Sequence, residues 1–136
     1  MCIRDRYTIM SMMSGDFSQI EGLLVSEIRL SSIQARIFLL IVVHGKMNVK
    51  NIAKKLEIST DDALANSKKL MELGAFIDMP DNEFEAMHPR FTAVNMYRKM
   101  CEREQIEFKK NLKVDNIGVV LEKPYDDART KYNKTK

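Results

Sequence analysis

Residues 31–88 have the sequence SSIQARIFLLIVVHGKMNVKNIAKKLEISTDDALANSKKLMELGAFIDMPDNEFEAMH, which contains the clearest structural pattern in the chain. This stretch contains three short helical patterns in quick succession, and each begins at a residue type that caps helices. Ser31 and Gln34 have the spacing of a capping box, Asn48 precedes the second pattern, and Ser59 precedes the third. The sequence therefore predicts helices over residues 32–43, 49–56 and 60–73.

The first of these helices is apolar over most of its surface, with Ile33, Ile37, Phe38 and Ile41 on several sides. A helix that is apolar nearly all round is one buried in the middle of a domain. Gly45 ends it, because glycine adopts the left-handed conformation that follows many helices at little cost. We expect this helix to be the centre of the core.

A hairpin pattern follows the third helix, which ends at Gly74. Residues 76–79 and 84–87 suit two short strands, and Pro80 suits the second position of the turn between them. Two helices joined by a tight turn and followed by a hairpin are typical of a winged helix-turn-helix. The predicted fold is therefore mainly α with a small β-hairpin: a winged helix-turn-helix with an N-terminal helix and a long C-terminal helix.

The flanking segments complete the predicted organisation. Asp16 and Gln19 have capping-box spacing before a short amphipathic helix, and Thr92 can cap a long helix to about Lys113. A short helix over 114–123 follows, and Pro124 should break it. The predicted divisions are a sequencing-adaptor scar at 1–6, a disordered start at 7–15, the winged helix-turn-helix at 16–90, a helical dimerisation arm at 91–123 and a basic tail at 124–136.

Composition excludes several classes of function. The chain has 136 residues, 45% of them hydrophobic, and its longest apolar run is far shorter than the ~20 residues of a membrane span. Its two cysteines and two histidines are scattered, so neither a disulfide framework nor a metal site is indicated. No nucleophile with a positioned base and no glycine-rich phosphate loop occurs. We expect a cytoplasmic binding module without a cofactor, not an enzyme; the sequence indicates no small-molecule effector.

The net charge of +3 is unevenly distributed. Residues 31–89 carry seven Lys/Arg against eight acids, whereas residues 90–136 carry twelve against seven. The basic character therefore lies in the C-terminal part, which is either an arm that contacts nucleic acid or a solvated tail.

In a helix-turn-helix the second helix of the motif enters the major groove of double-stranded DNA. Lysines on the 49–56 and 60–73 helices either contact DNA phosphates or form a solvated basic face. Asn66 either pairs with an adenine edge or is solvated, and Asp61 and Asp62 either accept hydrogen bonds from cytosine or stabilise their own helix start, where Asp62 completes a capping box with Ser59. The predicted DNA-binding residues are Lys50, Lys54, Lys55, Ser59, Thr60, Asn66, Lys68 and Lys69.

The 92–113 helix carries apolar residues at spacings of three and four. Such a stripe either pairs with a second copy of the chain or packs on the N-terminal helix. We expect a homodimer, because a single winged helix reads few base pairs. The predicted dimerisation residues are Tyr97, Met100, Cys101, Phe108 and Leu112, and Cys101 is expected to be a small buried hydrophobe.

From Leu30 onward the chain resembles the TrmB-like winged-helix family of archaeal transcriptional regulators. The matching residues are Leu30-Ser31, Gln34-Ala35-Arg36, Phe38-Leu39, His44-Gly45, Ile52-Ala53, Ile58-Ser59, Leu70, Leu73-Gly74, His88-Pro89-Arg90-Phe91 and Asn95-Met96-Tyr97-Arg98. The resemblance implies a dimeric DNA-binding regulator.

The chain departs from the family pattern at the presumed DNA-reading surface. Relatives usually begin the third helix with basic residues, whereas here it begins Thr60-Asp61-Asp62, and the hairpin carries four acids and no base. Two functional hypotheses follow: a DNA-binding transcriptional regulator, or a winged helix that serves as a protein-interaction module in a transcription complex. A metabolite-sensing regulator is a third, and it needs a pocket that the sequence does not reveal.

Overall fold

A computed structural model of the chain describes residues 16–134, with side chains over 18–128. The predicted adaptor scar and disordered start lie outside the described residues, as does the side chain of Asp16. The elements in chain order are α2 (Asp16–Glu27), α3 (Ser32–His44), β1 (Lys46–Asn48), α4 (Val49–Leu56), α5 (Thr60–Glu72), β2 (Phe76–Met79), the short 3₁₀ turn η1 (Pro80–Asn82), β3 (Glu83–Ala86), α6 (Pro89–Glu104) and α7 (Leu112–Lys134).

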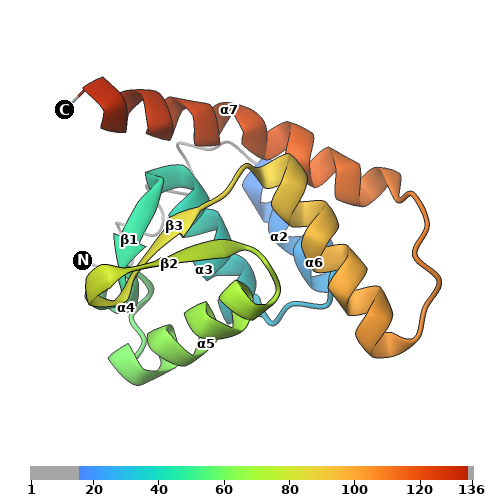
Figure 1. Cartoon of the computed structure of the whole chain (residues 1–136), viewed down its shortest axis with the longest axis horizontal. Helices are drawn as coiled ribbons and strands as arrows, with labels where there is room; N and C mark the ends of the chain where they lie inside the picture. Colours follow the sequence, from blue (N-terminus) through green and yellow to red (C-terminus); the bar gives the residue numbers. More distant parts are fainter. Residues whose placement is uncertain (1–15, 135–136) are drawn as a thin grey trace.

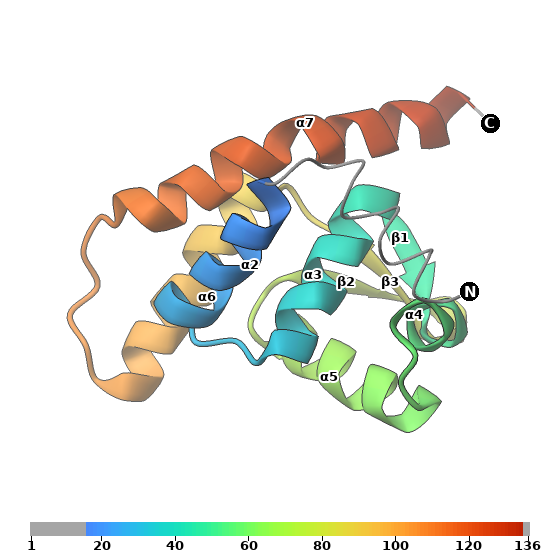
Figure 2. The same cartoon turned by 180° about the vertical axis from the view of Figure 1, so that it is seen from behind.

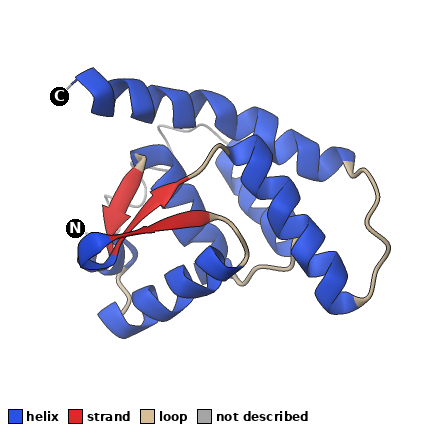
Figure 3. Ribbon diagram, viewed as in Figure 1, coloured by secondary structure: helices blue, strands red, loops and turns tan. Residues whose placement is uncertain are grey.

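The fold is mainly helical with one small antiparallel sheet, as predicted (Figures 1 and 3). Its centre is α3, which contacts α2, α4, α5 and α7 as well as two strands (Figure 2). Six consecutive residues of α3, 37–42, are buried, which confirms the prediction of a central helix. Burial of several large aliphatic side chains at about 1.5–3 kcal/mol each makes this helix the main source of hydrophobic stabilisation.

Local capping residues start α3, α4 and α5 where the sequence predicts. Ser31 Oγ accepts a hydrogen bond from the Gln34 backbone N–H, and the Gln34 side chain accepts one from the Ser31 N–H, both at 3.1 Å. Asn48 Oδ1 accepts from the Asn51 N–H at 2.8 Å at the start of α4. Gly45 ends α3 at φ +87°, in the region that glycine adopts without strain.

The sheet contains a third strand that the sequence analysis did not predict. β1 pairs antiparallel with β3, so that Met47 lies opposite Phe84, and β3 also pairs with β2 to give the order β1-β3-β2. Three residues are too few for an alternating pattern to show in the sequence. β1 forms because the hairpin presents the edge of β3 to it.

The predicted long helix from Thr92 to Lys113 is wrong at both ends. α6 begins at Pro89, three residues before Thr92, and its N-cap is His88, whose Nδ1 accepts a hydrogen bond from the Arg90 N–H at 3.2 Å. Thr92 is therefore not a cap and is buried within the helix.

α6 ends at Glu104, Gln105 adopts a left-handed conformation at φ 57° and ψ 42°, and the Ile106 N–H donates to the Cys101 carbonyl at 2.8 Å. Asn111 Oδ1 then accepts from the backbone N–H groups at the start of α7, the nearer at 2.9 Å. Two capping arrangements therefore divide a stretch whose apolar spacing suggested one helix.

Pro124 does not break the last helix, contrary to prediction, and the predicted basic tail is largely helical. α7 runs from Leu112 to Lys134 with Pro124 inside it. An internal proline removes one backbone hydrogen bond and costs about 3 kcal/mol in an isolated helix. Here Leu121 and Tyr125, which flank it, are both buried, and α7 lies across α2, α3 and α6 (Figures 1 and 2). This packing offsets the cost.

Candidate nucleic-acid interface

α4 and α5 form a helix–turn–helix on the opposite side of the molecule from α7 (Figures 1 and 2). Glu57 makes the turn in a left-handed conformation at φ 57° and ψ 45°, and its N–H donates to the Ala53 carbonyl. The Ile58 N–H donates to the same carbonyl at 3.0 Å. Ser59 then caps α5, since its Oγ accepts from the Asp62 N–H at 3.0 Å.

α5 packs on α3 through one face and exposes the other. Its buried residues are Ala63, Ser67 and Leu70, which lie three and four positions apart and so share a side of the helix. The side chains on the opposite, exposed side are Asp61, Asp62, Ala65, Lys68, Lys69 and Glu72. Two carboxylates therefore occupy the first turn of this face and two ammonium groups lie about two turns further on.

The predicted phosphate-contacting lysines are available on the surface. Lys50 and Lys54 lie one turn apart on the exposed side of α4, and Lys55 is half-buried beside them. Lys68 and Lys69 are exposed on α5. Among the residues that the structure describes, none of the five forms an ion pair. Their charges are thus not neutralised by the described residues and can attract an external anion.

The polar residues predicted to contact DNA differ in whether their side chains already form hydrogen bonds within the chain. Thr60 and Ser59 are exposed, but the Ser59 hydroxyl is used as the helix cap. The capping box expected there is only half formed: the carboxylate of Asp62 does not accept from the Ser59 N–H, so it stays available at the surface.

Asn66 is held by the protein itself. Its amide nitrogen donates to the Asp62 carbonyl at 2.9 Å, and its Oδ1 accepts from Gln34 Nε2 at 3.4 Å. Both ends of this amide are therefore engaged, one with its own helix and one with α3. An adenine contact by Asn66 requires these bonds to break, so the structure favours a supporting role for this residue.

The predicted dimerisation residues do not form one stripe, which corrects that part of the prediction. Met100 and Cys101 are both buried within the chain. This burial is expected for Cys101, but Met100 is expected at a dimer interface. Phe108 and Leu112 are exposed and lie beyond the end of α6, in the 105–111 loop and at the start of α7. Tyr97 is half-buried with its ring 5.9 Å from that of Phe108. The centre of this apolar stripe is therefore covered by other parts of the same chain, so it is not free to pair with a second copy.

Neither a membrane-spanning helix nor a metal-binding cluster occurs in the described part of the chain. Within residues 16–134 no helix is long and apolar enough to cross a membrane. No group of three or more His, Cys, Asp or Glu residues there is arranged to hold a metal ion. Comparison of the chain with models of known families, with curated proteins and with solved structures finds no match.

Proposed function

We propose that the chain is a DNA-binding transcriptional regulator of the winged helix-turn-helix type, similar to the TrmB-like regulators. α5 enters the major groove, and the lysines of α4 and α5 contact phosphates. The observation that carries the proposal is the set of five lysines on these two adjacent helices, none ion-paired among the described residues.

The order of elements supports the same proposal. α3, α4 and α5 are followed directly by the β2–β3 hairpin, which is the succession of helices and wing in winged helices. The first turn of α5 faces outward with Asp61 and Asp62, and carboxylates in the major groove accept hydrogen bonds from cytosine amino groups. The expected preference is thus for sites with cytosine at the positions that this turn reaches.

The test is fluorescence anisotropy of the full chain with random and promoter-derived duplexes at two salt concentrations. Binding should weaken steeply with salt, because each phosphate contact releases counterions. Lys54→Glu with Lys68→Glu should lower the slope of log K against log salt by about 2, since two phosphate contacts are lost. Arg90→Glu with Lys123→Glu, on α6 and α7, changes the net charge equally and should leave the slope unchanged. Equal effects of the two pairs would contradict the proposed docking face.

A second function, a winged helix that binds another protein in a transcription complex, has one specific observation in its favour. All the charged side chains of the β2–β3 hairpin are carboxylates, and DNA phosphates repel a wing with this negative charge. Absence of any duplex binding at low salt, with the chain folded by circular dichroism, would select this second function.

A further inference from the structure

The end of α6, the following loop and the start of α7 form a surface that is both basic and apolar. We call residues 98–113 the basic loop; they contain six Lys/Arg and three Glu. Phe108 packs against Tyr97, and the Arg98 guanidinium lies 5.1 Å from the Phe108 ring centroid. Even so, Phe108 remains 46% exposed, Ile106 42% and Leu112 73%. The basic loop therefore presents three large apolar side chains to solvent.

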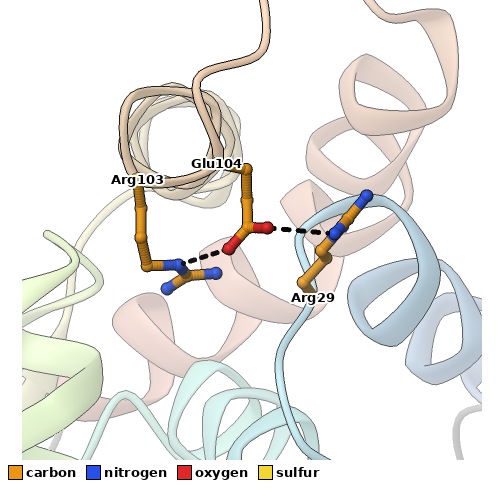
Figure 4. A network of polar contacts seen from close by, with 3 residues as sticks. All are labelled: Arg29, Arg103 and Glu104. Atoms are coloured by element: carbon orange, nitrogen blue, oxygen red, sulfur yellow. Dashed lines mark hydrogen bonds and ion pairs between the residues drawn. The ribbon is translucent and has the colours of Figure 1, made fainter.

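Internal ion pairs do not neutralise the basic loop. Glu104 is shared between Arg103 and Arg29, with both nitrogen–oxygen distances at 3.2 Å (Figure 4). Lys109 pairs with Glu107 at 3.5 Å. In the described part of the chain Lys99 and Lys110 have no ion pair. Lys113 pairs with Glu27 of α2 at 3.9 Å. With six Lys/Arg against three Glu, the surface keeps a net positive charge.

A surface of opposite character lies on the β2–η1–β3 hairpin. We call residues 76–87 the acidic hairpin; they contain four carboxylates and no Lys or Arg. Glu83 pairs with Lys46 of β1 at 3.8 Å, whereas Asp78 and Asp81 are exposed and, among the described residues, not ion-paired. Ile77 is 44% exposed, and the register that places it opposite Glu85 puts the two on one face of the sheet. This surface too combines charge with an exposed apolar side chain.

The two surfaces cannot satisfy each other within one chain. The hairpin turn and the 105–111 loop lie at opposite ends of the longest axis of the molecule in both views (Figures 1 and 2). We propose that the basic loop of one copy binds the acidic hairpin of a second copy, and that the two copies lie antiparallel so that both contacts form. The pair is then symmetric, with each copy giving its loop and receiving its partner's.

The free energies of such contacts favour a dimer held by two loop–hairpin contacts over an association held by one. An exposed ion pair contributes about 0–1 kcal/mol, so one loop on one hairpin is a weak association even with its apolar contacts. Once the first contact forms in an antiparallel pair, the second is effectively intramolecular, so it adds affinity without a further loss of translational entropy. Neither surface includes α5, so the inference is independent of DNA binding.

The test is sedimentation velocity of the full chain over a concentration series at low and high salt. The chain should form dimers that dissociate as salt screens the charges. Lys109→Glu with Lys110→Glu, and separately Asp78→Lys with Asp81→Lys, should each raise the dissociation constant about tenfold or more, because opposite charges become like charges. Mixing the two variants should restore dimers, since the reversed loop then meets the reversed hairpin. Lys68→Glu with Lys69→Glu on α5 is the control and should leave the dimer intact.

Several outcomes would overturn the proposal. A wild-type chain that stays monomeric at low salt lacks the contact. Dimers that survive both reversals use another surface, and variants that fail to restore each other on mixing do not pair loop with hairpin. Binding of the monomeric chain to phosphatidylserine vesicles, lost in Lys109→Glu with Lys110→Glu, would instead assign the basic loop to an anionic lipid surface.

Discussion

The contact between α6 and α7 depends on the absence of a side chain at Gly118. A Cβ built on Gly118 would lie 2.7 Å from the Arg90 Cα and 3.2 Å from the Arg90 backbone nitrogen. These are backbone atoms at the start of α6, so relief requires the helices to move apart. Overpacking of this kind costs about 1–3 kcal/mol. Alanine also gains about 1 kcal/mol of helix propensity over glycine, so Gly118→Ala should have a net effect between about zero and 2 kcal/mol of destabilisation.

Gly22 provides the matched control, because it lies on the exposed side of α2 with no described atom within 4 Å of a built Cβ. Gly22→Ala should stabilise the chain by up to about 1 kcal/mol through propensity alone. Urea unfolding of both variants isolates the steric term as their difference, about 1–3 kcal/mol, or roughly 4–12 °C in midpoint temperature. If both substitutions stabilise the chain equally, α6 and α7 do not approach each other as closely as described, and the argument for their packing is refuted.

Two further predictions concern buried residues. Ser67 is fully buried in α5, and its hydroxyl has no hydrogen-bond partner among the described residues. Ser67→Ala should therefore raise the free energy of unfolding by about 1 kcal/mol in urea titrations; a loss of stability would mean that the hydroxyl is satisfied. Tyr125 is 3% exposed with its ring 5.2 Å from that of His88, so Tyr125→Ala should cost about 3–5 kcal/mol. A cost below 1 kcal/mol in thermal unfolding would mean that α7 does not pack beyond Pro124.

Much of the candidate interface could be predicted from the sequence because its signals are local. Ser59 and Asn48 begin α5 and α4 through hydrogen bonds to residues three positions away. The exposure of Lys54 and Lys68 follows from helical periodicity, which places them opposite the apolar residues of their own helices. The function proposed for this surface remains a prediction, since no comparison bears on it.

Other features of the site depend on contacts distant in sequence. Asn66 looks free in the sequence, yet its side chain accepts a hydrogen bond from Gln34, 32 residues earlier. The apolar stripe that suggested a dimer seam is divided because Asn111 caps a new helix and also donates to Glu27 of α2 at 3.0 Å. Its central residues, Met100 and Cys101, are then buried within the chain.

The start, the end and the buried face of α3, α4 and α5 can be predicted from local sequence, because caps and periodicity act within one or two turns. Three features become visible only in the folded chain: a third strand joins the sheet, α6 ends at Glu104, and α7 continues through Pro124. The third strand and the path of α7 through Pro124 result from packing between segments far apart in the chain. Tertiary packing therefore offsets the local cost of Pro124 inside α7. The end of α6 depends on a local left-handed residue, Gln105, whose signal is too weak to recognise in the sequence alone.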